Sequence, residues 1–291
     1  MQWSYANTKH GRLHYAEAGA GPALLLLPSA GRSGHVFDGL VQLLSPDFHV
    51  IAVDMLGCGN ADPIPPGAGI ETFAECIVDL LDHLHIRQAH IYGFHIGNKI
   101  AAALASRWPD RVDHVVLAGQ SHSLIPEKSK RESTIYGNVS SNFPDQGADD
   151  SQNRLKQWAA AYRRLTDFWW HESILSNAHD PKVFEQARLA VLDRIQSQNS
   201  VVAIYEAVLS YDLEAGMRGI RAKTLIIEAV TGSEDSQIGR QGEAILRIMP
   251  HAQLALIQES EAPKHAVTLA EHYPQIAQLV RSFIQSGTAQ T

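Results

Sequence analysis

One histidine stands where the surrounding residues could make it chemically reactive. His95 lies between Gly93 and Gly97, two residues from each. Residues 89–94 read as a short strand and the residues after His95 as a helix, so His95 falls at the turn between them. Glycines at this spacing permit a strained backbone and a close approach of strand and helix. An imidazole aimed out of such a turn could attack a carbonyl carbon or take a proton from water or substrate.

A regular alternation of strands and helices is needed to position this turn. Short aliphatic runs bounded by turn residues predict buried strands, and amphipathic stretches predict the helices between them. The alternation predicts an α/β fold with a mainly parallel central sheet flanked by helices. The predicted strands cover residues 12–18, 24–27, 49–54, 89–94, 112–118, 224–227 and 253–257, and the clearest helices cover 36–44, 71–85, 239–248 and 274–284.

The composition changes after Gly119, which suggests an insertion into this pattern. Residues 121–150 are rich in Ser, Asn, Asp, Gly and Pro and read mostly as loop, whereas 151–218 carry apolar residues at helical spacing. We therefore expect one core domain built from residues 1–120 and 219–291, interrupted by a helical insertion over 121–218.

Charge and cysteine content narrow the class of protein. The 291 residues carry a formal net charge of −7 without any block of Lys and Arg, which argues against nucleic acid and membrane surfaces as partners. Cys58 and Cys76 show no metal-ligand spacing, and two cysteines do not suggest a disulfide framework. The N-terminus lacks a signal-peptide pattern, so we expect a cytoplasmic protein. The longest aliphatic run, residues 23–27, is too short to span a bilayer.

Three segments, taken in order, resemble one known family. The turn around His95 resembles the G-x-S-x-G nucleophile elbow of the α/β-hydrolase fold family, with histidine in place of the serine. Residues 54–62 are similar to that family's D-x-x-G-x-G-x-S-D loop, and residues 107–112 look like the segment that ends the helix after the elbow. The resemblance implies the α/β-hydrolase fold, in which the insertion over 121–218 would be the helical cap, or lid.

The resemblance also implies partners for His95. The oxyanion hole would be formed by the backbone N–H groups of Ile96 and Ala30. The histidine that moves protons would follow the strand 253–257, where His265 is the only histidine in the loop; His272, near the final helix, is expected at the surface. The acid would follow the strand 224–227.

Two carboxylates compete for the acid position. Asp235 lies slightly late for it, and Glu228 directly follows residue 227, where it could belong to the strand itself; we take Asp235 as the first choice. Ser29, His122 and Trp169 are expected to line the substrate pocket. His95, His122 and His265 could together form a zinc site, but they lack local metal spacing, so we expect no metal.

Three functions remain open at this point. The first is cofactor-free hydrolysis of an ester, lactone, thioester or C–C bond in a small apolar carbonyl compound, with His95 at the nucleophile position. The second is lyase, isomerase or cofactor-free oxygenase chemistry with His95 as general base. The third is a catalytically silent protein that binds a small molecule. In each case the expected partner is a small molecule, and the chain is a monomer or a homodimer.

Overall fold

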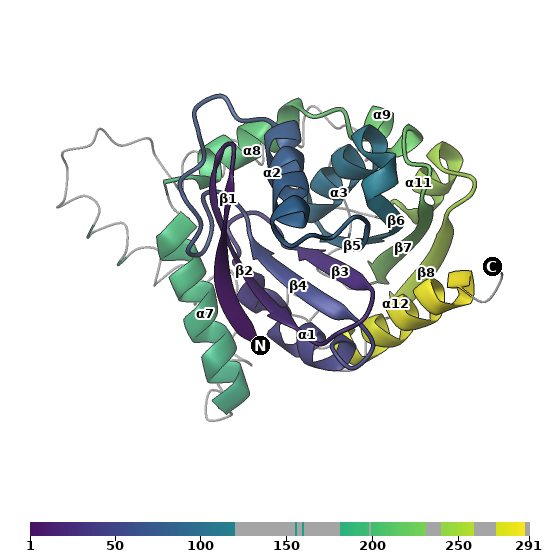
Figure 1. Ribbon diagram of the computed structural model, residues 1–291, viewed down its shortest axis with the longest axis horizontal. Coiled ribbons are helices and arrows are strands. Elements are labelled where there is room, and N and C mark those ends of the chain that lie inside the picture. The colour runs from purple at the N-terminus through teal and green to yellow at the C-terminus, as the bar shows by residue number, and fades with distance from the viewer. Residues whose placement is uncertain are drawn as a thin grey trace.

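A mixed sheet forms the centre of the molecule. The computed structural model describes residues 1–119, 155, 159, 181–197, 199–230, 240–258 and 272–288. Within these residues the sheet has eight strands in the order β1-β2-β4-β3-β5-β6-β7-β8 (Figure 1). β1 and β2 pair antiparallel, β2 pairs antiparallel with β4, and all other neighbours are parallel. The strands are β1 (Gln2–Thr8), β2 (Gly11–Ala18), β3 (Ala23–Leu27), β4 (His49–Asp54), β5 (Ala89–Phe94), β6 (Val112–Ala118), β7 (Lys223–Val230) and β8 (Gln253–Gln258).

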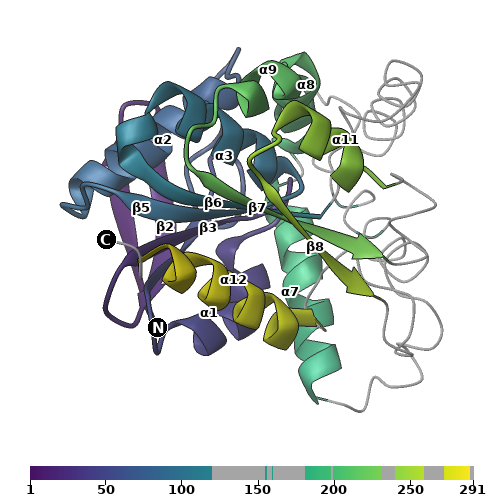
Figure 2. The ribbon, with the colours of Figure 1, turned by 90° about the vertical axis from the view of Figure 1, so that its right-hand side faces the viewer.

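Helices cover both faces of the sheet, as Figure 2 shows. One face carries α2 (Ile70–His83), α3 (Ile96–Arg107), α8 (Val201–Ser210), α9 (Leu213–Arg218) and α11 (Gly242–Ile248); the other carries α1 (Asp38–Leu44) and α12 (Tyr273–Thr288). A separate hydrophobic core fills the space on each side. The middle strands are therefore buried on both faces, and every residue of β3 is buried.

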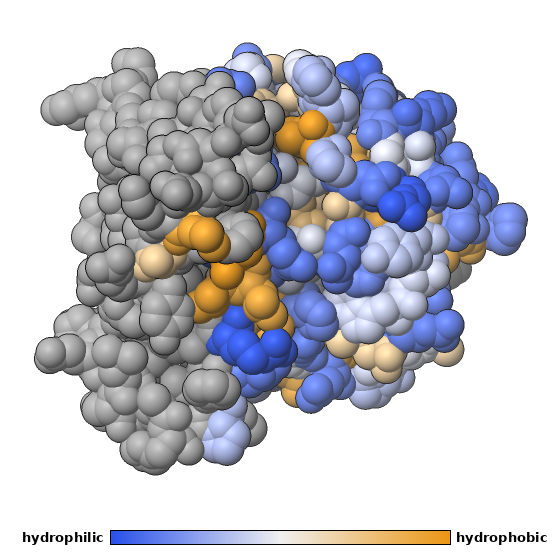
Figure 3. All heavy atoms as spheres, turned by 90° about the vertical axis from the view of Figure 1, so that its left-hand side faces the viewer, coloured by the Kyte–Doolittle hydropathy of each residue, from blue (hydrophilic) through white to orange (hydrophobic). Residues whose placement is uncertain are grey.

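One further helix lies at the edge of this arrangement of a central sheet with helices on both faces. α7 (Pro181–Ser197) lies at the left of Figure 1. Leu192 of α7 is 40% exposed. On the face drawn in Figure 3, hydrophobic side chains gather next to the grey atoms. Within the described ranges, no helix has both the length and the apolar character needed to cross a bilayer.

The predicted α/β architecture is confirmed, and most predicted strands lie within two or three residues of the observed ones. The strand β1 was missed because its sequence is mostly polar, with only Ala6 buried. The predicted helix over 36–44 is instead a short 3₁₀ turn (Gly34–Phe37) followed by α1. The division into a core and an insertion over 121–218 falls largely outside the described residues and stays a prediction.

Two histidines differ from the sequence-based expectation. α2 ends at His83 rather than His85, because His85 adopts a left-handed φ of 55°. The backbone N–H groups of His85 and Ile86 then donate to Asp82 and Leu81, which closes a Schellman motif. His272 was expected at the surface, but it is only 6% exposed, at the beginning of α12. Packing of α12 against the sheet buries this end of the helix.

Candidate active site

His95 occupies a sharp turn between β5 and α3. Its φ of 50° and ψ of −103° lie outside the regions that residues with a side chain normally adopt. The turn is held from both sides: the His95 N–H donates to the carbonyl of Ala118 at 3.1 Å, and the Asn98 N–H donates to the carbonyl of His95 at 3.1 Å. The surrounding structure therefore imposes a strained backbone at the residue that the sequence singles out.

The two flanking glycines allow the strand and helix to approach closely. A β-carbon on Gly93 would lie 2.6 Å from the carbonyl carbon of Gly97, and one on Gly97 would lie 2.8 Å from that of Leu27. These are backbone atoms, which cannot move aside as a flexible side chain would. The glycines are thus required by packing among β3, β5 and α3, and this packing holds the turn in place.

The imidazole of His95 lies over the end of β6. Its ring centroid is 4.2 Å from that of Phe94, at an angle of 33° between the ring planes. A β-carbon on Gly119 would lie 2.8 Å from Nε2 of His95. The buried amide of Asn98 fixes the backbone beneath the ring, because its Nδ2 donates to the carbonyls of Ala118 at 3.0 Å and Gly119 at 3.2 Å. The ring itself is half-buried.

The residues predicted to form an oxyanion hole lie directly after this turn and on the loop beside it. Ile96 is the first residue of α3, where backbone N–H groups point away from the helix and attract negative charge. Ala30 follows β3, and Leu27 at the end of β3 pairs with Gly93 of β5. Ser29, predicted to line the pocket, lies in the same loop. The fold therefore brings this loop and the His95 turn to one edge of the sheet.

A tight turn shapes the loop that contains Ala30. The Arg32 N–H donates to the carbonyl of Ser29 at 3.2 Å, and Gly31 between them has a φ of 67°. A positive φ at the third residue is what a type II turn requires. A β-carbon on Gly31 would also meet Oγ of Ser197 at 3.1 Å. The loop is consequently held both by its own turn hydrogen bond and by packing against Ser197.

Asp54 joins the loops at this edge, a role that the sequence did not reveal. The side chain is fully buried and accepts hydrogen bonds from the N–H of Gly34 at 2.6 Å and of Asn60 at 2.9 Å. Its Oδ2 also lies 2.8 Å from Nδ1 of His14 on β2. One carboxylate thus fixes the start of the 3₁₀ turn, the loop after β4 and a neighbouring strand.

Helix α7 is bound to the same loop by a largely buried ion pair. Nε of Arg32 lies 2.8 Å from Oδ2 of Asp193, which is 3% exposed. The Ser197 hydroxyl donates to the carbonyl of Gly31 at 3.4 Å. Cys58 lies close by, and burial raises the pKa of its thiol to about 12, so it stays protonated at neutral pH and is not a competing nucleophile.

Helix α8 is tied to the helix that follows His95. Lys99 is one turn beyond His95 on α3 and is 2% exposed, and its Nζ donates to the backbone carbonyl of Val208. A buried ammonium group needs such partners because leaving it unsolvated is costly. The bond therefore couples the position of α8 to that of α3.

Of the two carboxylates considered for the acid, the structure describes Glu228. It lies on β7, is 6% exposed, and its Oε1 accepts hydrogen bonds from the N–H of Gln241 at 2.5 Å and of Gly242 at 2.7 Å. These are the amides at the start of α11, so Glu228 caps that helix. Asp235, His122, Trp169 and His265 lie outside the described residues.

Comparison with known proteins places the chain in a family. Residues 22–227 match the family model of the alpha/beta hydrolase fold. The 2-hydroxymuconate semialdehyde hydrolase of Pseudomonas putida is 30% identical over 248 residues, which cover 82% of this chain and 78% of that protein. The chain belongs to the α/β-hydrolase fold family, as the resemblance around His95 implied.

Two other similarities show how far the likeness extends. An uncharacterised protein of Mycobacterium tuberculosis is 34% identical over 111 residues, and the match spans 38% of this chain and only about a third (33%) of that relative. The crystal structure of the enol-lactonase from Burkholderia xenovorans superposes with a TM-score of 0.74 at 19% identity and covers 97% of this chain and 100% of that one. The latter likeness concerns the fold.

Proposed function

We propose that this chain is a cofactor-free enzyme that cleaves an ester, lactone, thioester or C–C bond in a small apolar carbonyl compound, with His95 as its central catalytic group. The observation that carries the proposal is the strained turn that holds His95 between β5 and α3. Strain of this kind persists where the surrounding structure imposes it, and it is concentrated at functional sites.

An imidazole can perform this chemistry without the base that a serine requires. Serine needs a neighbouring base because its hydroxyl is a weak nucleophile at neutral pH, whereas the neutral imidazole has a lone pair ready. His95 would attack the carbonyl carbon to give a tetrahedral oxyanion. This would collapse to an acyl-imidazole as the bond to the oxygen, sulfur or carbon leaving group breaks and the leaving group takes up a proton. Water would then hydrolyse the acyl-imidazole to a carboxylic acid and free His95. The oxyanion that develops would be stabilised by the N–H groups of Ile96 and Ala30.

The remaining catalytic roles follow from position in the fold. We assign proton transfer to His265 and its orientation to Asp235. The helix-capping hydrogen bonds of Glu228 support this choice, because they already engage the competing carboxylate. A second imidazole near His95 would disfavour protonation of both rings, since like charges repel. Ser29, His122 and Trp169 would line the substrate pocket.

We further propose that residues 121–218 form a cap over the site. Two contacts of the described helices support this assignment: the Arg32–Asp193 ion pair joins α7 to the loop of Ala30, and Lys99 joins α8 to α3. A cap held in this way would exclude water and select the substrate. Both cysteines are buried free thiols, which fits the reducing cytoplasm that we propose as its compartment.

The names of two similar proteins support the substrate class. One is named for a semialdehyde and the other for an enol-lactone, and both are carbonyl compounds. We extend only this shared feature, an electrophilic carbonyl in a small molecule, to the present chain.

A second candidate function rests on the same histidine. Because His95 replaces a hydroxyl nucleophile with a base, it is also suited to remove a proton from a substrate carbon in a lyase, isomerase or cofactor-free oxygenase reaction. The oxyanion hole would then stabilise an enolate. The two candidates differ in what happens at His95: a covalent bond forms in the first, and only a proton moves in the second.

The test compares turnover by native protein, His95→Ala and His95→Ser on short-chain activated esters and lactones. His83→Ala is the matched control, because His83 is an exposed histidine at the end of α2. We expect activity in the native protein and the control, none in His95→Ala, and an acyl adduct on His95 by mass spectrometry after rapid quenching.

Other outcomes separate the alternatives. Deuterium exchange at a substrate carbon without hydrolysis would favour the general-base reaction. A silent native protein beside an active His95→Ser variant would show that the groups around the elbow can still support a serine nucleophile, whereas the native protein performs other chemistry. Ligand-induced stabilisation without any turnover would indicate a binding protein, and undiminished activity in His95→Ala would contradict the assignment of His95.

A further inference from the structure

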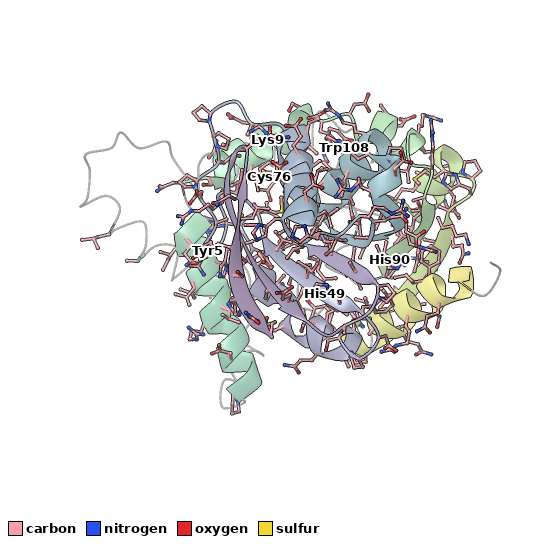
Figure 4. The ribbon with its side chains drawn as sticks, viewed as in Figure 1. Tyr5, Lys9, His49, Cys76, His90 and Trp108 are labelled. Carbon is pink, nitrogen blue, oxygen red and sulfur yellow. The ribbon has the colours of Figure 1, made fainter. Side chains whose placement is uncertain are left out.

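Two buried histidines and an aspartate meet at the edge of the sheet opposite to His95. His90 is the second residue of β5, after Ala89, and Asp113 and His114 lie at the start of β6. Figure 4 labels His90 on the strands beside α12, at the same end of the sheet as His49. Five residues of extended chain separate His90 from His95, which corresponds to about 16 Å at about 3.3 Å per residue. The cluster is therefore separate from the proposed active site.

A β-bulge brings the three side chains together. Ala89 pairs with Val112 and Ile91 pairs with Val115, so β6 has one more residue than β5 between these pairs. Both Asp113 and His114 consequently lie opposite His90. Without the bulge, neighbouring residues of β6 would point to opposite faces of the sheet. Bulges of this kind redirect side chains and are frequent beside functional sites.

The distances within the cluster are those of ligands around one ion. Oδ2 of Asp113 lies 3.5 Å from Nδ1 of His90 and 3.2 Å from Nδ1 of His114. One donor atom from each of the three residues lies within 4.8 Å of the others. Ligand atoms bound to a tetrahedral zinc ion at about 2.0–2.1 Å are about 3.3 Å apart. The observed spacing matches this value on both sides of Asp113.

The ring nitrogens lack the hydrogen bonds that buried histidines normally make. His90 is 5% exposed and His114 is 3% exposed. Among the described residues, Nδ1 of His90 and both nitrogens of His114 have no hydrogen-bond partner. Buried polar groups left in this state cost free energy, and an unseen ion is one of the explanations for them.

The surroundings of the cluster suit a bound cation. The ring of Phe48 packs edge-on against His90 at 6.1 Å between centroids, and Phe283 of α12 packs edge-on against His114 at 5.3 Å. This apolar wall limits access of water from the core side. The side chain of Asp113 is 46% exposed, so an ion can enter from solvent along its carboxylate.

We propose that His90, Asp113 and His114 form a binding site for a divalent transition-metal ion, with Zn²⁺ the best match to the donor set. Two imidazoles and one carboxylate are a ligand set that zinc takes in proteins, with water in the fourth position. The ion would join the starts of β5 and β6 near α12. It would lie at the other end of the strands from His95, apart from the proposed reaction.

Zinc binding to the full chain tests this proposal. Protein freed of any affinity tag and treated with chelator is dialysed against Zn²⁺, and bound metal is measured by mass spectrometry. We expect one zinc per chain and a higher midpoint of thermal unfolding when zinc is present. Co²⁺ in place of zinc should give the intense visible absorption of a tetrahedral site.

Variants locate the ion. His90→Ala and His114→Ala should each weaken zinc binding by more than the roughly 10–100-fold that loss of a supporting group costs. Asp113→Asn tests the site even if the buried histidine variants fold poorly, since its exposed side chain is not needed for packing, and it should weaken binding as well. His83→Ala is the control for an exposed histidine and should bind zinc like the native chain.

Two results would overturn the proposal. The first is the absence of stoichiometric zinc in the native, tag-free protein. The second is zinc that His95→Ala removes but Asp113→Asn and the His90 and His114 variants retain, which would place the ion at the elbow instead. Turnover by the zinc-free protein is expected to equal that of the loaded protein, so this result can be read independently of the proposed reaction.

Discussion

A β-carbon on Gly119 would lie 2.8 Å from Nε2 of His95, so the imidazole occupies space that only a glycine at position 119 leaves open. Gly119 also has a φ of 70°, and its N–H donates to the carbonyl of Ile227 at 3.0 Å. The end of β6 is thereby held against β7 while it supports the ring of His95. The position of the proposed catalytic group thus depends on a residue 24 positions away in the sequence.

Gly119→Ala should displace the imidazole and destabilise the protein. The substitution adds both the steric overlap with His95 and the cost of a positive φ, which is about 1–2 kcal/mol for a residue with a β-carbon. Gly67→Ala is the matched control, because Gly67 has a similar φ of 73° but open space around it. Urea unfolding and turnover should show a larger loss of stability for Gly119→Ala, and a loss of activity for that variant alone.

The double variant Gly119→Ala with His95→Ala tests whether overlap with His95 causes the loss of stability in Gly119→Ala. Removing the imidazole should restore the stability lost to overlap with His95. What remains should be the cost of a positive φ, as in Gly67→Ala, together with a close contact to Phe94, whose Cε2 would lie 3.0 Å from the new β-carbon. If the double variant is no more stable than Gly119→Ala, the overlap with His95 is not the source of the destabilisation.

Asp193→Asn should loosen the contact between α7 and the loop of Ala30. Removing one partner of a buried ion pair costs about 3 kcal/mol, since the other charge is left without compensation. Movement of the Ala30 N–H should also lower kcat by roughly 10-fold or more. Chemical unfolding and steady-state kinetics measure the two effects separately.

An exposed ion pair on the same helix provides the comparison. Nη2 of Arg188 lies 2.6 Å from Oε1 of Glu185, and both side chains are about half exposed. Glu185→Gln should therefore have little effect on stability and leave the rate unaltered, because solvent screens an exposed pair. Equal effects of Asp193→Asn and Glu185→Gln would mean that the Arg32–Asp193 pair does not hold the loop.

Asp235→Asn and Glu228→Gln should affect different properties. We expect Asp235→Asn to lower kcat by roughly 10²–10⁴-fold through the orientation of His265, with little change in stability. Glu228→Gln keeps an acceptor for the N–H groups of Gln241 and Gly242 but loses its charge, so it should cost about 1 kcal/mol of stability and leave the rate near normal. The reverse pattern of rates would make Glu228 the orienting acid.

His90 should make the metal-free protein less stable in mild acid. Burial, helped by the neighbouring His114 and opposed by Asp113, lowers the pKa of His90 from 6.5 to about 4. Between these two pH values the unfolded chain binds a proton at this site and the folded chain does not. The free energy of unfolding should therefore fall as the pH drops from 6.5 towards 4, and His90 should add no pH dependence above that window.

The pH effect is measured by urea unfolding in the presence of a chelator at several pH values between 7.5 and 4.5, chosen to span roughly this window. His90→Gln should reduce the dependence on pH, whereas His83→Gln, at an exposed position, should retain it. An unchanged slope in His90→Gln would show that other groups account for the acid sensitivity.

Much of the architecture could be predicted because local patterns are strong in the core strands. The run of four leucines in β3 is buried on both faces, and α2 has its apolar residues on one side. The strand β1 could not be predicted in this way, since its mostly polar residues hold their place by pairing with β2 rather than by burial. The early end of α2 depends on the left-handed conformation of His85, which is uncommon for residues other than glycine.

The candidate site likewise contains some features that the sequence predicts and others that it does not. The spacing of Gly93, His95 and Gly97 was enough to predict the turn, because glycines there serve a close approach of backbones within one short segment. The roles of Asp54 and Asp193 were missed, because each depends on partners distant in the sequence. Glu228 could be placed on its strand but not recognised as the cap of α11.

By itself, the sequence determined the alternation of strands and helices, the family and the identity of the residue at the elbow, because these depend on composition and spacing within short segments. Only the tertiary structure decided which distant residues meet: Gly119 under His95, Asp193 on Arg32, and Asp113 with His114 opposite His90. The reason is physical, since strand order, a single bulge and the packing of loops set these contacts, and none of them leaves a periodic signal in the chain.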